Sequence, residues 1–372
     1  MDISFNEDQV LLRDSVSAMC SQFSNLIEVR AQEGTEPGYS QLFWQQLIDL
    51  GITGMSIPEK YGGLEMDLLD SLIVYEEFGR NLSFSPHFIS CSFGAGLISR
   101  LGSPLQKEEI LPLIATGKTI LTVAWLEVGS SFLETSVNMT AQLKGDKYFL
   151  SGKKHMVPYA ISSNKMILLC KDSEGVLSAF MVDMSLEGIS IEYQPNHAGE
   201  SLYEVNFDGV ELEESMLLAK GNELIVSWSS TVNDCLVLLA ALASGGSEQS
   251  LHLGVEYSKE RELFGQRLGG FQSIAHYLAD ALVEVEANKL LCYQAAWTKS
   301  RASDLLRLSA MAKMQTCQTF RNVSATSIQI YGGLGFTTEA DPQLFFRRAK
   351  HLQNFLWDQS YLEERISNVL LD

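Results

Sequence analysis

The sequence lacks the features that mark two large classes of protein. Its formal net charge is −19 over 372 residues, so it has no surplus of basic residues for nucleic acid or an anionic membrane, and its own charge would repel both. The most apolar run, Cys235–Ala243, is about half of the length that a helix needs to cross a bilayer. We therefore expect neither nucleic acid nor a membrane as a partner.

Paired cysteines and a targeting segment are missing as well. The six cysteines lie far apart, without a CxxC pair or a cluster of Cys and His: Cys20, Cys91, Cys170, Cys235, Cys292 and Cys317. In a chain of this length they are typical of buried thiols in a reducing compartment, so we expect neither a disulfide framework nor a metal site. The first residues, MDISFNEDQVLLRD, are acidic and amphipathic, unlike a secretory signal or an Arg-rich transit peptide. These observations favour a cytoplasmic location.

The chain does have the composition of a globular protein, and three successive segments differ in the spacing of their apolar residues. The hydrophobic content is 46% and the charged content 20%, and the length suits about two or three domains. Residues 1–117 show helical spacing, and SPLQKEEILPLI opens with Ser103 placed to cap a helix and Pro104 at its first position. Residues 118–220 are short apolar runs between turn residues, which predicts an antiparallel β domain. Residues 221–372 return to helical spacing, with helices of about 20 to 30 residues that suit an antiparallel bundle.

One stretch of this last segment, Tyr257–Asp280, has an unusual composition. Four charged residues are followed by Phe264 and by three glycines around Arg267. Arg261 lies on the last turns of one expected helix and Gln272 opens the next, so a guanidinium and an amide could grip a phosphate or a nucleotide edge. The alternative is a solvated helix–turn–helix corner with an Arg–Glu pair on its surface.

Four motifs in this order resemble the acyl-CoA dehydrogenase family over essentially the whole chain. They are LGITGMSIPEKYGG (50–63), GSPLQKEEILPLIATGK (102–118), ERELFGQRLGGFQ (260–272) and QIYGGLGFTTEADPQLFFRRAK (329–350). The resemblance implies an α+β fold with an N-terminal helical domain, a central antiparallel β domain and a C-terminal four-helix bundle. It also implies FAD, dimers or dimers of dimers, and an acyl-CoA thioester as substrate. In that chemistry a carboxylate takes the α proton while the β hydrogen leaves as hydride to the flavin.

The residues that the family lends to a neighbouring subunit are retained. In the family, the Arg and Gln that match Arg261 and Gln272 contact the diphosphate and adenosine half of FAD bound to the neighbour, and Phe264 matches a residue of the same contact. The segment that matches Gln329–Gly333 contacts the adenosine end, and Gly332 and Gly333 permit close approach.

The residues that the family uses for a subunit's own flavin are largely absent. The flavin-holding run, usually Thr-Glu-Pro-x-x-Gly-Ser-Asp, matches 126–133, where only Glu127 remains; Leu126 and Phe132 replace hydrogen-bonding residues. The Trp-Ile-Ser/Thr run that packs on the flavin reads Met156, Val157, Pro158, and Pro158 has no backbone donor.

The catalytic base is missing at both family positions, which are Leu356 and Cys235 here. The Asp and Arg of a substrate-contacting Asp-x-x-Arg match Asn233 and Leu236. Asp358 is the candidate substitute base, with Asp234 as a second choice; the alternative is that Asp358 caps a helix and Asp234 is solvated. Trp357 replaces a glycine that contacts the flavin and would fill the space that the cofactor uses.

Two hypotheses follow from this division. The favoured one is a non-catalytic partner subunit, which assembles with a paralogous chain and lends it contacts to FAD. Family members that act on bulky polycyclic thioesters are known to pair subunits in this way. The other is a self-sufficient acyl-CoA dehydrogenase with a displaced Asp base, and a related alternative is a flavin oxidase or monooxygenase on the same fold.

Overall fold

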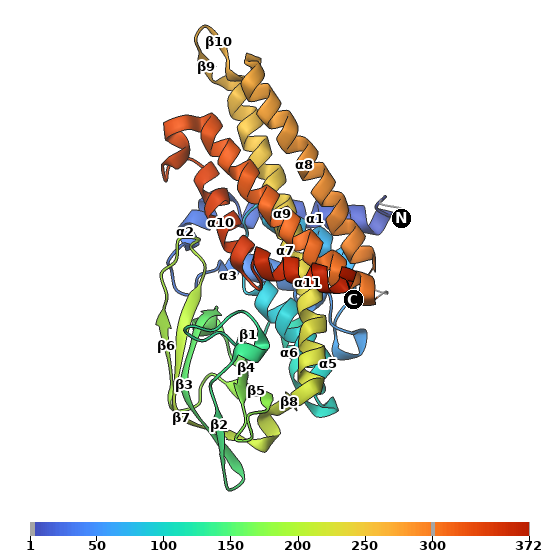
Figure 1. The fold of residues 1–372 in the computed structure, drawn as a ribbon, viewed down its shortest axis with the longest axis vertical. Helices are drawn as coiled ribbons and strands as arrows, with labels where there is room; N and C mark the ends of the chain where they lie inside the picture. Colours follow the sequence, from blue (N-terminus) through green and yellow to red (C-terminus); the bar gives the residue numbers. More distant parts are fainter. Residues whose placement is uncertain (1–3, 299–301, 372) are drawn as a thin grey trace. The chain divides into compact units, whose positions relative to one another are not determined.

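The structure, a computed structural model, describes residues 4–298 and 302–371. Strands occupy the middle of the chain and helices both ends, which confirms the expected fold class (Figure 1). The strands run from Leu121 to Lys220, and the long helix α7 begins at Gly221. The chain forms two compact units that cut across the three sequence segments. The helical unit comprises Met1–Val29, Leu68–Ser83 and Asn233–Asp372; the sheet unit comprises Arg30–Asp67 and Phe84–Val232.

The sheet unit contains two four-stranded sheets. Their orders are β1-β4-β5-β8 and β2-β3-β7-β6. The strands are β1 (Leu121–Ala124), β2 (Ala141–Lys144), β3 (Lys147–Pro158), β4 (Lys165–Lys171), β5 (Leu177–Asp183), β6 (Ile189–Tyr193), β7 (Leu202–Glu213) and β8 (Leu217–Lys220). All neighbours are antiparallel except β1 and β4, which are parallel. The expectation of a wholly antiparallel domain is therefore wrong for this pair, because the β2–β3 hairpin lies within the connection and makes it long enough to return the chain in the same direction.

The core of the sheet unit draws alternate residues from strands of both sheets. Met166 and Leu168 of β4 lie in one buried cluster with Val205 and Phe207 of β7. This period of two is the pattern that directs every second side chain to the same face of a strand.

Short helices complete the sheet unit. They are α3 (Gln41–Asp49), a π-helix (Phe88–Gly94), α5 (Ala95–Leu101) and α6 (Pro104–Ala115), while α2 (Leu26–Gln32) crosses from the helical unit. The predicted start of α6 is confirmed: the Ser103 hydroxyl accepts the N–H of Gln106 at 3.3 Å, and Pro104 takes the first position. The Gln106 amide also donates to the carbonyl groups of Ser215 and Leu217, so the same turn holds the link from β7 to β8.

The helical unit is built from long helices and one small hairpin. They are α1 (Glu7–Phe23), α4 (Leu68–Arg80), α7 (Gly221–Glu260), β9 (Glu262–Leu263), β10 (Gln266–Arg267), α8 (Gln272–Trp297), α9 (Ala302–Tyr331), α10 (Pro342–Asn354) and α11 (Gln359–Leu371), with α7 entering from the sheet unit. By length and composition α7 could cross a membrane, but 67% of its apolar window is buried inside the protein. A buried core helix passes the same test, so this is weak evidence for a membrane span.

Helices α4 and α7 approach each other so closely that glycine is required on both. A Cβ on Gly79 of α4 would lie 2.0 Å from the carbonyl oxygen of Leu242, and one on Gly245 of α7 would lie 1.9 Å from the carbonyl oxygen of Glu76. Both contacts are with backbone, which cannot rotate away. The two helix axes therefore have to separate if either glycine gains a side chain.

We expect Gly79→Ala and Gly245→Ala each to lower the free energy of unfolding by about 2 kcal/mol or more, because overpacking displaces a whole helix. Urea unfolding followed by circular dichroism measures the change. Gly254→Ala is the matched control on α7: its Cβ would make only ordinary contacts, at 3.4 Å or more, and a helical alanine should be neutral or stabilising. Wild-type stability of both crossing variants would show that the helices are not so close.

Candidate functional site

The corner between α7 and α8 carries the first group of predicted cofactor residues. Arg261 directly follows the last residue of α7, and its N–H donates to the carbonyl of Tyr257 at 2.9 Å. Gln272 begins α8, as the spacing predicted. Between them the chain forms the β9–β10 hairpin, so the expectation of a plain helix–turn–helix corner is wrong here. The reason is the Phe264–Gly265 turn, in which both residues have positive φ (+52° and +81°), the backbone form that joins two strands by a two-residue turn.

Phe264 is held at the tip of this hairpin in an unfavourable way. Its side chain is 94% exposed, and its ring lies perpendicular to that of Phe271, at a centroid distance of 6.4 Å. A left-handed conformation costs a non-glycine residue about 1–2 kcal/mol. Because burial within the chain returns little of this cost, the position is suited to contact with another molecule.

The end of α9 carries the second group. Gln329, Gly332 and Gly333 are exposed, and Gly332 has a φ of +64°. A Cβ at either glycine would meet nothing within 4 Å, so open space lies above both. Tyr331 stacks on Tyr257 at 4.0 Å, which ties this segment to the last turn of α7.

The structure thus brings both predicted groups to the same end of the helical unit, where α7 ends, α8 begins and α9 ends (Figure 1). A guanidinium, two carboxamides, an exposed aromatic ring and open glycine backbone are available there. These groups can bind a phosphate and a nucleobase.

In the sheet unit, Glu127 serves the protein itself. Its carboxylate accepts the N–H groups of Asn138 and Met139, and the ammonium of Lys154 lies 2.7 Å away. Burial raises the pKa of Glu127, but Lys154 outweighs burial and the net pKa is lowered; burial lowers the pKa of the fully buried Lys154. The one residue kept from the flavin-holding run therefore forms a structural ion pair.

The next segment of the sheet unit satisfies its own polar groups. The N–H of Met156 donates to the side chain of Gln194 at 2.7 Å, and the N–H of Tyr159 donates to the carbonyl of Ser201. Pro158 has no N–H, and its carbonyl accepts the hydroxyl of Thr122. Within the run that matches the flavin-packing residues, Met156 and Pro158 thus offer no free backbone donor to a flavin edge.

The four-residue connection from α10 to α11, Phe355–Asp358, includes position 356, where the family carries its catalytic base, and the side chain at this position is buried. Leu356 is 1% exposed with a φ of +61°, and Trp357 is 2% exposed. The guanidinium carbon of Arg365 lies 4.1 Å from the centre of the Trp357 ring, and Arg365 also donates to Asn233 at 3.3 Å. Asn233, which matches a substrate-contacting Asp, is therefore engaged within the chain.

Asp358 has the alternative role that the sequence allowed. It is exposed, and its carboxylate accepts the N–H of Tyr361 at 3.0 Å, so it caps the start of α11. Asp234 is half-buried beside the fully buried Cys235. A catalytic role for Asp358 stays a prediction.

Sequence reasoning missed several residues of these contacts, among them Gln194, Arg365 and Lys313, whose ammonium donates to the carbonyl groups of Gln353 and Trp357. Lys313 carried a usable signal, because a charged residue stands within the buried stripe of α9 and is 0% exposed. Gln194 and Arg365 gave none, since they act across long sequence separations.

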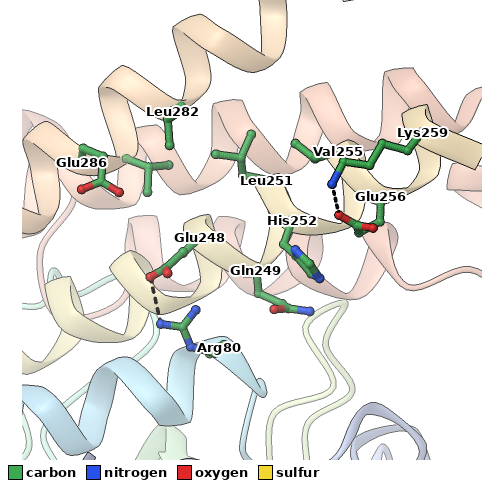
Figure 2. A pocket seen from close by; sticks show the side chains of 11 residues that line it. Arg80, Glu248, Gln249, Leu251, His252, Val255, Glu256, Lys259, Leu282 and Glu286 are labelled. Atoms are coloured by element: carbon green, nitrogen blue, oxygen red, sulfur yellow. Dashed lines mark hydrogen bonds and ion pairs between the residues drawn. The ribbon is translucent and has the colours of Figure 1, made fainter. Parts of the chain in front are cut away.

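A hollow of about 470 Å³ lies along α7 and α8 (Figure 2). Its apolar lining residues include Leu251, Val255 and Leu282. Its charged lining residues include two ion pairs, Arg80–Glu248 and Lys259–Glu256. Another hollow, of about 410 Å³, lies in the sheet unit beside Glu127 and His155.

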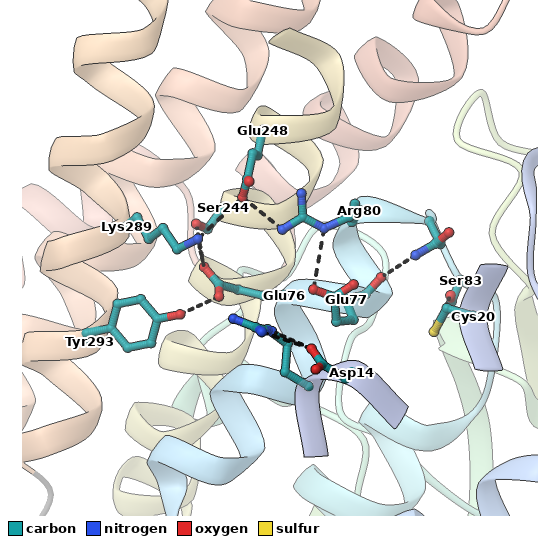
Figure 3. A network of polar contacts seen from close by, with 12 residues as sticks. Asp14, Cys20, Glu76, Glu77, Arg80, Ser83, Ser244, Glu248, Lys289 and Tyr293 are labelled. Atoms are coloured by element: carbon teal, nitrogen blue, oxygen red, sulfur yellow. Dashed lines mark hydrogen bonds and ion pairs between the residues drawn. The ribbon is translucent and has the colours of Figure 1, made fainter. Parts of the chain in front are cut away.

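The Arg80–Glu248 pair continues into a buried network between α4, α7 and α8 (Figure 3). Glu76 is 5% exposed and accepts the hydroxyl groups of Ser244 and Tyr293. Lys289 lies 3.9 Å from Glu76 and 3.4 Å from Glu248. Burial raises the pKa of Glu76 despite these partners.

Comparison with known proteins points to one family. The models of the acyl-CoA dehydrogenase N-terminal and C-terminal domains match residues 6–118 and 230–355. CarC, a subunit of the caffeyl-CoA reductase–Etf complex of Acetobacterium woodii, is 28% identical over 88% of this chain and 90% of its own. Butyryl-CoA dehydrogenase of Megasphaera elsdenii has the same fold, with a TM-score of 0.90 and 24% identity over 100% of both chains. So does a chain of the ChsE4–ChsE5 complex of Mycobacterium tuberculosis, with a TM-score of 0.89 and 24% identity over 100% of this chain and 99% of that one.

Placing a carboxylate at the family base position should destabilise the chain. We expect Leu356→Glu to lower the free energy of unfolding by about 2–4 kcal/mol at pH 8. Burial raises the pKa of a carboxyl group, so the folded protein holds a proton that the unfolded chain has lost, and the loss should grow from pH 5 to pH 8. Urea unfolding at both values measures it. Leu356→Gln, which does not titrate, should lose stability equally at both; a stable, pH-independent Glu variant would contradict the packing described.

Glu76 should make stability fall as pH rises. Its folded pKa lies above the ordinary 4.5, so its contribution is complete below pH 4.5 and is lost as pH rises through the folded pKa. We expect Glu76→Gln to flatten this part of the curve of unfolding free energy against pH. Glu248→Gln is the control of opposite sign, because Arg80 and Lys289 outweigh burial and lower the pKa of Glu248. An unchanged slope in Glu76→Gln would refute the assignment.

Proposed function

We propose, since this chain belongs to the acyl-CoA dehydrogenase family of FAD-binding flavoproteins, that it acts in the α,β-dehydrogenation of acyl-CoA thioesters as a non-catalytic partner subunit. It assembles with a paralogous chain that holds the flavin and the base, and lends that chain contacts to the adenosine half of FAD. We place this assembly in the cytoplasm, because the six widely spaced cysteines are typical of thiols in a reducing compartment.

The observation that carries the proposal is the division between open and closed positions. The residues to be lent, among them Arg261, Phe264 and Gly333, are exposed at one end of the helical unit. Leu126 and Leu356, at positions that a subunit needs for its own chemistry, are buried. Met156, at a third such position, is 40% exposed, but its N–H is bound to Gln194. Random loss of residues would not separate the two sets in this way.

The exposed set fits one half of the cofactor. Arg261 would hold the diphosphate by charge-assisted hydrogen bonds, and Gln272 and Gln329 would bind polar groups of the adenosine. Gly332 and Gly333 leave space for the close approach of a nucleotide. The FAD, when bound, supplies the hydride acceptor; this chain's residues hold and orient its far end.

The residues at the second set of positions do not fit the other half of the cofactor. A flavin edge needs hydrogen-bond donors, but the side chain of Leu126 has none, Pro158 has no N–H, and the N–H of Met156 is already bound to Gln194. At the base position Leu356 is buried, and the neighbouring Trp357 packs against Arg365. No proton acceptor stands at that position of the chain.

Two relatives support a shared assembly. ChsE4 and ChsE5 form a complex of two differently named chains, and CarC is a subunit of a larger complex. In the alternative, this chain is itself a dehydrogenase that uses Asp358, or a flavin oxidase or monooxygenase. Asp358 is exposed and caps α11, so it would have to leave its cap to reach a buried substrate.

The test is to express the tagged chain alone and with each paralogue of its source organism that carries the Thr-Glu-Pro run and the Glu base. We expect the lone chain to be colourless, and one pair to retain FAD that an acyl-CoA bleaches. In that pair, Arg261→Ala should weaken FAD retention at least about tenfold, because a charged contact to phosphate is lost.

Arg267→Ala is the matched control, since Arg267 is an exposed arginine of the same hairpin that is not among the predicted contacts. It should leave FAD retention unchanged. A lone chain that carries stoichiometric FAD, bleached by an acyl-CoA, would refute the partner-subunit proposal.

A further inference from the structure

Lys313 of α9 is a buried ammonium that forms no ion pair with any carboxylate in the part of the chain that the structure describes. It is 0% exposed, and burial lowers its pKa. Among the described residues its hydrogen-bond partners are two backbone carbonyl groups, those of Gln353 (2.9 Å) and Trp357. The negative charge of Asp358 raises the pKa of Lys313, although the two side chains form no ion pair among the described residues.

These two carbonyl groups frame the connection between α10 and α11. The carbonyl of Gln353 belongs to the last turn of α10, where the helix dipole is negative and favours a cation. The carbonyl of Trp357 lies at the far side of Leu356, the residue in the left-handed conformation. One side chain therefore spans the strained turn and holds both of its ends.

We propose that Lys313 is the positioning residue that keeps this connection closed. By holding the carbonyl groups of Gln353 and Trp357, it fixes Leu356 at a φ of +61° and keeps the Trp357 indole buried against Arg365. The turn needs such a hold because a left-handed leucine is strained, and a neighbouring contact has to offset that strain. A buried ammonium is stable in turn only while its hydrogen bonds are made.

The contribution of Arg365 differs from that of Lys313. Arg365 packs on the face of the indole, while its Nε and the indole Nε1 are buried without a hydrogen-bond partner. It therefore holds the ring, and Lys313 holds the backbone. This inference concerns the lone chain and stands whether or not the chain lends contacts to a partner.

The test is amide hydrogen exchange of the full-length chain, read on peptides that cover 353–360. We expect Lys313→Met to speed exchange of the 355–358 amides at least tenfold while exchange in the β9–β10 hairpin stays unchanged. Ser324→Ala is the matched control, a buried polar residue of the same helix that bonds only to its own helix. It should leave the connection within twofold of wild type.

A double variant separates positioning from general support. In Leu356→Gly the left-handed turn carries no strain, so adding Lys313→Met should speed exchange at least threefold less than it does beside Leu356. If Lys313→Met does not fold, Lys313→Gln replaces it throughout, because its amide is too short to span both carbonyl groups. Wild-type exchange in the Lys313 variant, an acceleration spread equally over the helical unit, or equal effects in both backgrounds would each overturn the proposal.

Discussion

The close contact between α4 and α7 is the constraint on which the helical unit depends. Gly79 and Gly245 let the two backbones touch, and this leaves Glu76 no route to solvent. The buried carboxyl group then has to be satisfied by Ser244 and Tyr293, which draws α8 into the same contact. Because α7 is fixed in this way, two residues on either side of this contact are fixed as well: Asn233, where α7 enters the helical unit, and Arg261, directly after its last turn.

The two ends of this arrangement have opposite characters. At the Arg261 end the ring of Phe264 is exposed to water on a strained turn, and open space lies above Gly332 and Gly333. These features cost stability unless another molecule binds there. At the Asn233 end polar groups are consumed within the chain, by Arg365 on Asn233 and by Lys313 on the α10–α11 connection. A subunit that only lends contacts needs the first end open and has no need of the second, which is free to become a packed core.

Much of the fold followed from local pattern. The cap at Ser103, the lengths of α8 and α9 and the break at Arg261 are set by neighbours within a few residues, so spacing was enough to predict them. The 40 residues of α7 exceed the expected 20 to 30, because this helix continues from the sheet unit into the helical unit. The parallel pairing of β1 with β4 and the β9–β10 hairpin were not predicted. Strand direction depends on a partner far along the chain, and the hairpin depends on Phe264 adopting a backbone form that its residue type disfavours.

The sequence by itself determined which chemical groups this protein has lost and kept, because a missing carboxylate at 356 or a retained guanidinium at 261 is a fact of composition and position. Only the tertiary structure decided what occupies the vacated positions. Leucine and tryptophan at 356 and 357 could have lined an empty pocket, but both are buried. Lys313, 44 residues away, reaches the carbonyl of Trp357, and Arg365 of the next helix packs on the Trp357 indole. Such contacts depend on how helices pack, and packing joins residues that no local pattern relates.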